Sequence, residues 1–150
     1  RPHPQSVYPS SAPVGRDKPP AIVCSTAEAV LVFRRDGADR WACEEIPIPD
    51  DCGTGKSAVP GDFDLDGDAD LVVTCEHAEG KLAGVFWLEY VDEGARPSWR
   101  PRVLGGPTGT KFDRAEVIDL DGDGDLDVVT CEERESLGVI WYENPHRRRP

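Results

Sequence analysis

The feature of this sequence that most constrains its fold is an internal repeat. Residues 62–76 and 119–132 both combine a run rich in Asp with the tail Val-Val-Thr-Cys-Glu, and each is followed by a similar apolar run, GVFWLEY at 84–90 and GVIWYEN at 138–144. A weaker copy precedes them, with AIVCS at 21–25 and AVLVF at 29–33. The period of about 55 residues is typical of a chain built from one repeated supersecondary unit.

Each repeat contains four predicted short strands. In the middle copy, β-branched and aromatic runs separated by Gly, Asp and Pro clusters predict strands at 58–61, 71–75, 84–90 and 99–104. Residues 41–46 repeat the pattern of 99–104, which predicts the same fourth strand in the first copy. Four antiparallel strands per period are typical of a β-propeller blade, whereas a β-sandwich of stacked hairpins would not require this period.

We therefore predict an all-β chain. Residues 1–150 are expected to form one propeller-type repeat region, with about three blades near residues 21–46, 58–104 and 115–145.

The two stronger repeats each carry a nine-residue loop, 62–70 and 119–127, with Asp at alternate positions and Gly at the sixth. Alternate side chains of a tightly turned loop can point inward at a hard cation, and a set of oxygen ligands favours calcium over zinc or copper. We predict one Ca²⁺ per loop, held by four Asp side chains and by the backbone carbonyl of the Asp at position 7. The predicted metal-binding residues are Asp62, Asp64, Asp66, Asp68 and Asp70 in the first loop and Asp119, Asp121, Asp123, Asp125 and Asp127 in the second.

Two other interpretations of these loops are weaker. Asp and Gly favour surface turns without any ligand, but five carboxylates within nine residues repel one another unless a cation gathers them. A helical EF-hand needs Glu at position 12, where the two loops have Val73 and Thr130. It also needs flanking helices, where this chain has β-branched runs.

The Asp-rich loop, followed by Leu-Val-Val or Val-Val and then by Gly-Val-Ile-Trp-Tyr-Glu-Asn-Pro, resembles the FG-GAP and VCBS-type repeats of integrin-like β-propellers. The resemblance covers about residues 21–145. It implies that calcium stiffens the loop between the first and second strands of a blade. It says little about activity, because similar propellers occur in adhesion proteins, lectin-like modules and accessory domains of large bacterial enzymes.

Two departures from the family pattern concern completeness. The first repeat has Arg-Asp-Lys-Pro-Pro at 16–20 where its loop should be, and three blades are too few to close a ring. The remaining blades of a longer chain, or a homo-oligomer, could complete the ring. The last blade lacks a fourth strand after Pro145, and the N-terminal segment 1–20 could supply one near residues 5–8.

Five Cys rule out a complete set of intramolecular disulfides. Cys24, Cys75 and Cys131 end similar runs, which predicts one buried position that recurs in each repeat. Cys43 and Cys52 could pair in an oxidising compartment, and we expect an extracellular or periplasmic protein.

The net charge of −12, with its single basic run at the end of the chain, disfavours a nucleic-acid partner. No apolar run approaches the length of about 18 residues that a membrane-spanning helix needs.

The pattern favours a binding function over an enzymatic one. No Ser, Cys, Lys or His stands in a recognisable catalytic motif, and Gly-Thr-Gly-Lys-Ser at 53–57 lacks the first glycine of a phosphate-binding loop. We predict a binding or scaffolding module with structural calcium and a protein or carbohydrate partner. The alternatives are the substrate-binding part of a larger carbohydrate-active lyase or dehydratase, and a fragment without separate activity. Trp87 and Trp141 could stack on a sugar, but their mid-strand positions favour core packing.

Overall fold

The computed structural model describes residues 6–14, 18–92, 94, 97–105 and 108–145, and for 6–13 it describes the backbone alone. These residues form eleven strands and no α-helix, which confirms the predicted all-β chain. No helix in this part of the chain is long and apolar enough to cross a membrane.

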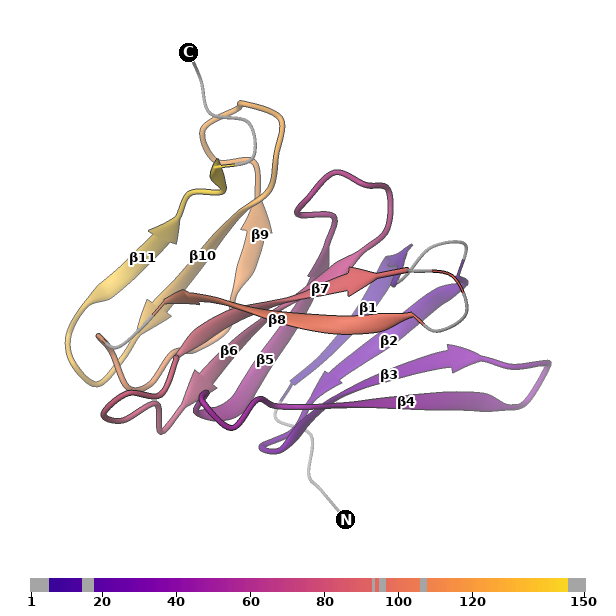
Figure 1. The fold of residues 1–150 in the computed structure, drawn as a ribbon, viewed down its shortest axis with the longest axis horizontal. Helices are drawn as coiled ribbons and strands as arrows, with labels where there is room; N and C mark the ends of the chain where they lie inside the picture. Colours follow the sequence, from indigo (N-terminus) through magenta and orange to yellow (C-terminus); the bar gives the residue numbers. More distant parts are fainter. Residues whose placement is uncertain (1–5, 15–17, 93, 95–96, 106–107, 146–150) are drawn as a thin grey trace.

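The strands form three antiparallel sheets, each in simple up-and-down order (Figure 1). The first sheet contains β1 (Ser6–Pro13), β2 (Pro20–Ser25), β3 (Ala29–Arg35) and β4 (Trp41–Pro47). The middle sheet contains β5 (Thr54–Gly61), β6 (Asp70–Glu76), β7 (Val85–Val91) and β8 (Ser98–Gly105). The last sheet contains β9 (Glu116–Ile118), β10 (Asp127–Glu132) and β11 (Gly138–Tyr142).

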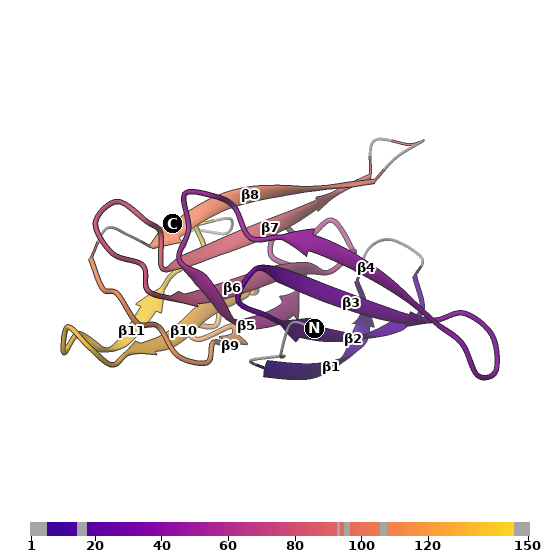
Figure 2. The same cartoon turned by 90° about the horizontal axis from the view of Figure 1, so that it is seen from below.

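The middle sheet confirms the predicted four-strand unit, since each of its four strands overlaps one predicted from the sequence. The first and last sheets lie on either side of it (Figures 1 and 2). The described residues therefore form a row of three sheets, and they do not form a closed ring.

Two apolar layers hold the row together. The layer between the first and middle sheets includes Val23 and Val32 from one side and Leu71 from the other, all fully buried. The layer between the middle and last sheets includes Val72 and Val128. Successive residues of a strand point to opposite faces, so Leu71 and Val72 of β6 contact different neighbouring sheets. The central strands β6 and β7 of the middle sheet are thus covered on both faces, which explains why they are mostly apolar.

The N-terminal strand corrects one expectation. β1 pairs with β2, with Val7 opposite Cys24, and forms an edge of the first sheet. The prediction that a strand near residues 5–8 completes the last sheet is therefore wrong. A strand that directly precedes another in the chain pairs with it at a low cost in loop-closure entropy. Among the described residues the last sheet has three strands, with β11 and β9 at its edges.

The cysteines correct two more expectations. All five thiols are free, so the pairing of Cys43 with Cys52 does not form. Cys43 is exposed on β4 whereas Cys52 is buried in the apolar layer beside the middle sheet, where burial raises its pKa to about 12. Cys75 is buried and Cys131 only partly so, which means that they do not occupy one recurring buried position.

Candidate metal centre

Both Asp-rich loops join the first and second strands of a sheet. Residues 62–70 lead from the end of β5 into β6, and residues 119–127 lead from β9 into β10. The flanking strands pair directly, with Gly61 opposite Asp70 and Ile118 opposite Asp127. The two loops are therefore held at matching places in neighbouring sheets.

In each loop the first three alternate Asp side chains converge. Asp62, Asp64 and Asp66 each offer a carboxylate oxygen, and these oxygens lie within 4.8 Å of one another. Asp119, Asp121 and Asp123 form an equivalent group within the same limit. We call these groups the first and second Asp triads.

The glycine at position 6 allows the tight turn that gathers each triad. Gly67 and Gly124 have φ angles of 96° and 99°, a left-handed region that residues with a Cβ rarely adopt. No atom lies within 4 Å of the place where a Cβ of Gly67 would stand, so the backbone angle and not a lack of space requires glycine there.

Backbone N–H groups orient the triad carboxylates. In the first loop the N–H of Gly67 donates to Asp62 Oδ2 over 3.1 Å, and that of Asp68 donates to Asp66 Oδ1 over 3.1 Å. In the second loop Gly124 donates to Asp119 Oδ2 over 3.1 Å, and Asp125 donates to Asp123 Oδ1 over 3.2 Å. Hydrogen bonds of this kind, from nearby backbone N–H groups to Asp side chains, are typical of turns. The two loops therefore have the same hydrogen-bond pattern.

The Asp at position 9, predicted as a side-chain ligand, also anchors its loop to backbone N–H groups. Asp70 accepts hydrogen bonds from the N–H of Tyr90 over 2.7 Å and of Phe63 over 3.3 Å. Asp127 repeats this with the N–H of Asn144 over 2.8 Å and of Leu120 over 3.1 Å. Asp70 thus ties its loop to β7, and Asp127 ties its loop to the chain just after β11. Neither belongs to a triad, and the loop sequence itself does not indicate this anchoring contact with residues 20 and 17 positions away.

The Asp at position 7, predicted to use its backbone carbonyl, also lies outside the triads. Asp68 and Asp125 are buried, with 2% and 1% of their surfaces exposed. The structure thus brings together three of the five predicted residues in each loop and buries the other two beside them.

The electrostatics of the first loop favour a bound cation. Burial raises the pKa of Asp70 to about 7, although the hydrogen bonds from Tyr90 and Phe63 lower it. Burial and the charge of Asp66 raise the pKa of Asp64. A raised carboxyl pKa means that the charged form is disfavoured, and a cation nearby reverses this preference.

The donor set fits a hard divalent cation. Each triad presents carboxylate oxygens alone, and Ca²⁺ takes six to eight oxygen ligands from carboxylates, carbonyls and water. Such a set does not suit the softer ions that prefer nitrogen or sulfur. Within the described residues, these triads are the only groups of three or more acidic, His or Cys side chains close enough to share one ion.

His77 lies outside both triads. Its Nδ1 is 3.0 Å from Thr54 Oγ1. In the described part of the chain, His77 belongs to no group of side chains close enough to bind one metal ion. His3 and His146 fall outside the described residues.

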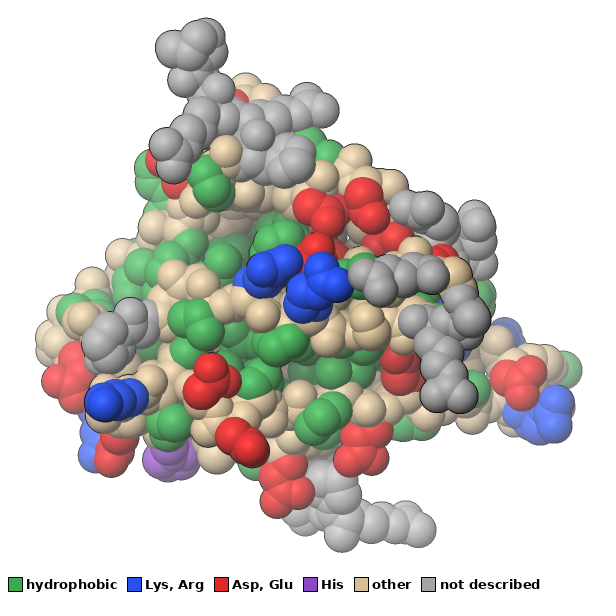
Figure 3. Space-filling model, viewed as in Figure 1, with side chains coloured by type: hydrophobic (Ala, Val, Ile, Leu, Met, Phe, Trp, Pro, Cys, Tyr) green, Lys and Arg blue, Asp and Glu red, His purple; other side chains and the backbone are tan. Residues whose placement is uncertain are grey.

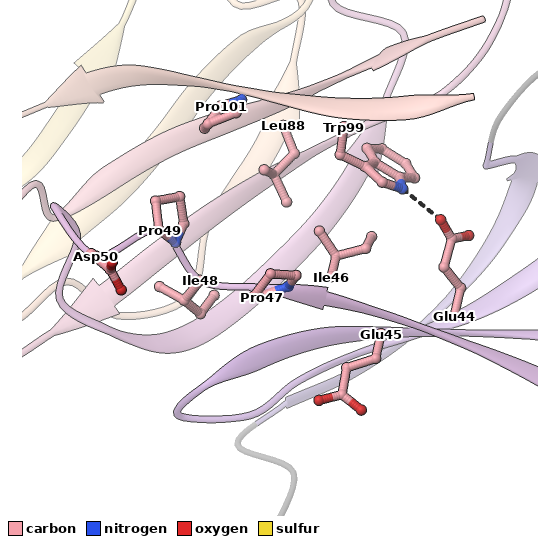
Figure 4. Close-up of a pocket in the computed structure, with 10 residues that line it drawn as sticks. All are labelled: Glu44, Glu45, Ile46, Pro47, Ile48, Pro49, Asp50, Leu88, Trp99 and Pro101. Carbon is pink, nitrogen blue, oxygen red and sulfur yellow. Dashed lines mark hydrogen bonds between the residues drawn. The ribbon is translucent and has the colours of Figure 1, made fainter. Parts of the chain in front are cut away.

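A cavity of about 470 Å³ lies between the first and middle sheets. Figure 4 shows Ile46, Leu88 and Trp99 around it, with the carboxylates of Glu44, Glu45 and Asp50 at its edges. Trp99 Nε1 donates to Glu44 Oε1 over 2.7 Å, and Glu44 also pairs with Arg34. These contacts join β4 to β8 and thereby fix the two sheets to each other.

A second cavity of about 400 Å³ lies between the middle and last sheets and includes Trp87, Arg102 and Tyr142 in its wall. Apolar side chains gather over this part of the surface (Figure 3). Trp87 is partly buried and packs against the layer between the two sheets, with the centroids of the Trp87 and Phe63 rings 6.3 Å apart. Packing between sheets accounts for Trp87, as its mid-strand position indicated.

No family model, curated protein or solved structure matches this chain. Its function is therefore argued from the two triads and the sheets that carry them.

Proposed function

We propose that this chain is a calcium-binding module of the β-propeller type, related to the FG-GAP and VCBS-type repeats, in which Ca²⁺ has a structural role and the sheets present a binding or scaffolding surface. The observation that carries the proposal is the pair of matched Asp triads, each at the same connection within its sheet. Two separate loops with one spacing and one hydrogen-bonding plan are difficult to explain as unrelated acidic turns.

Calcium suits these loops better than magnesium. Mg²⁺ demands near-octahedral geometry and keeps most of its water, whereas Ca²⁺ accepts many carboxylate and carbonyl oxygens in flexible arrangements. A loop that gathers three carboxylates within five residues offers the crowded oxygen set that calcium prefers.

The ion would act on stability through the loop and its anchor. It would offset the repulsion among Asp62, Asp64 and Asp66, and it would hold the loop on which Asp70 reaches the backbone of β7. An ion that binds only the folded state stabilises that state by mass action.

Thermal unfolding with and without calcium tests this proposal. At free calcium 100-fold above Kd the gain is about 2.7 kcal/mol, which for a domain of this size raises Tm by about 5–10 °C. We expect excess chelator to remove the gain and magnesium to reproduce little of it. An unchanged Tm in chelator would contradict the proposal.

Variants assign the effect to the triads. Asp66→Asn and Asp123→Asn should each remove part of the calcium-dependent shift, because each weakens one triad. Asp39→Asn is the matched control, since Asp39 is exposed and lies in the β3–β4 connection outside both loops. A control that lost as much as the triad variants would show that the effect comes from general charge and not from the loops.

A further inference from the structure

In the described part of the chain, nothing covers one apolar face of the last sheet. On the side turned away from the middle sheet it carries Ile118, Val129, Val139 and Trp141. Val139 is 77% exposed, Ile118 49% and Trp141 46%. Large apolar side chains grouped on one face of a soluble protein mark an interaction surface more often than chance exposure does. We call this group the open face.

The middle sheet shows what normally covers such a face. Strand pairing places Val72 opposite Trp87 in the middle sheet, as it places Val129 opposite Trp141 in the last sheet. Val85 and Val139 precede these two Trp residues by two positions on the same strand. Val72 and Val85 are fully buried because the last sheet packs on them. The open face of the last sheet thus corresponds to the face of the middle sheet on which the last sheet packs.

The opposite end of the row presents the complementary surface. On the first sheet, Ile22 pairs with Phe33, and Leu31 lies two residues before Phe33 on the same face. All three are only partly buried. Cys43, opposite Phe33 on β4, is exposed. We call these four residues the back face.

The same positions in the middle sheet are covered completely. Leu71 pairs with Leu88 there as Ile22 pairs with Phe33, and Phe86 corresponds to Leu31. Leu71 and Phe86 are fully buried against the first sheet. The back face is therefore the repeat of a face that a preceding sheet covers.

We propose that a second copy of this chain docks its back face on the open face, head to tail, and so extends the packing that joins the three sheets. That packing occurs twice within the chain, first sheet on middle sheet and middle sheet on last sheet. A copy of the chain carries, at its two ends, the repeats of the two faces that meet within the row. None of the residues of the open face or the back face belongs to an Asp-rich loop.

The symmetry of this contact differs from that of an ordinary two-fold dimer. Because the open face and the back face are different surfaces, the contact is heterologous. Heterologous contacts close into a ring when the rotation between copies permits. Each copy then uses both of its faces, and the assembly stops at a definite size.

Light scattering on the 150-residue chain, with calcium or with chelator, measures the assembly. We expect a single species of at least twice the 16.4 kDa chain mass. A mass of 16.4 kDa, that of one chain, at every protein concentration would overturn the proposal. The two faces would then be covered by another segment or left uncovered.

Two charge substitutions locate the contact. Val139→Lys lies on the open face and Cys43→Lys on the back face, and both positions are exposed enough to accept Lys in a folded single chain. We expect each variant alone to have the mass of one chain. Val103→Lys is the matched control, because Val103 is 56% exposed on β8 of the middle sheet, away from both faces. The control should keep the wild-type mass.

Mixing the two variants tests the head-to-tail arrangement. The Cys43→Lys chain keeps an intact open face and the Val139→Lys chain keeps an intact back face, so an equimolar mixture should form a complex of one of each. This recovery also shows that both variants are folded. A Cys43→Lys chain that still associates with itself would overturn the proposal, because open face would then meet open face. A mixture that stays at the mass of one chain would also overturn it.

Discussion

The middle and last sheets carry nearly the same sequence motif but differ by one residue, and that residue changes which side chains are buried. Between the anchoring Asp and the Thr-Cys-Glu tail, β6 has Leu-Val-Val and β10 has only Val-Val. Side chains alternate between the faces of a strand, so a shift of one position moves each residue to the other face. The loops are the same in both sheets, and the strands that follow them are not.

The consequence is clearest in the tail of the motif. Cys75 is fully buried and Cys131 is only partly buried. Glu132 is 3% exposed and accepts hydrogen bonds from four backbone N–H groups, those of Thr110, Lys111, Arg134 and Glu135. Its counterpart in the motif, Glu76, forms a partly buried ion pair with Lys56 over 3.3 Å. The Glu at the end of the motif thus anchors two loops in the last sheet, whereas in the middle sheet it forms one ion pair.

Core truncations should show the largest difference between the two sheets. Phe86→Ala removes a fully buried ring from the doubly covered sheet, and we expect it to lower the free energy of unfolding by about 3–5 kcal/mol. Ile140→Ala, at the corresponding position of the last sheet, removes a partly buried side chain and should cost about 1–2 kcal/mol. Urea unfolding measures both. Equal losses would contradict the deeper burial of Phe86 in the middle sheet than of Ile140 at the corresponding position of the last sheet.

Substitutions of Glu132 and Glu76, the last residues of the two motif copies, should show the next largest difference in stability. Glu132→Gln removes the charge that four N–H groups stabilise, and we expect a loss of about 1.5–3 kcal/mol. Glu76→Gln weakens a single, partly exposed ion pair and should cost less, about 1 kcal/mol. The two variants are matched controls for each other in the same urea experiment. An alignment of the motif alone predicts similar losses of unfolding free energy for the two variants. Similar losses would therefore contradict the different environments of Glu132 and Glu76.

The contribution of Glu132 should also depend on pH. Burial raises the pKa of Glu132, but the four backbone hydrogen bonds outweigh it and leave the pKa below its usual value of 4.5. A carboxyl with a lowered pKa in the folded state stabilises the protein above the unfolded pKa, and this stabilisation is lost as pH falls through the folded pKa. The difference in unfolding free energy between wild type and Glu132→Gln should therefore shrink at acid pH. A difference that stays constant from neutral to strongly acid pH would argue against this assignment.

Glycine substitutions should show the smallest effect and no difference between loops. Gly67→Ala and Gly124→Ala place a Cβ at φ angles of 96° and 99°. We expect each to cost about 1 kcal/mol, because a left-handed backbone disfavours any residue with a Cβ. Thermal unfolding in chelator isolates this backbone effect from metal binding. A loss in one loop alone would mean that the two turns are not equivalent.

Much of this arrangement could be predicted from the sequence. Short β-branched runs bounded by Gly, Asp and Pro located the four strands of the middle sheet, because each run is too short for a helix and is ended by turn residues. The loop spacing also predicted which Asp side chains converge, since alternate residues of a tight turn point the same way. Asp62, Asp64 and Asp66 are confirmed as one group of possible metal ligands, as are Asp119, Asp121 and Asp123.

The rest depended on contacts that no local pattern encodes. The anchoring role of Asp70 requires the backbone of Tyr90, which lies twenty residues away and meets it only across the sheet. The environments of Cys131 and Glu132 depend on one missing residue in a strand, which an alignment of motifs conceals. The place of β1 depends on which sheet edge its neighbour β2 offers.

The stoichiometry of calcium binding tests the central claim most directly. Isothermal titration of the wild-type chain should give two calcium ions per chain, one for each Asp triad. Asp66→Asn and Asp123→Asn should each reduce the number to one, and the double variant should bind none. A wild-type chain that binds no calcium, or a double variant that still binds two ions, would contradict the account.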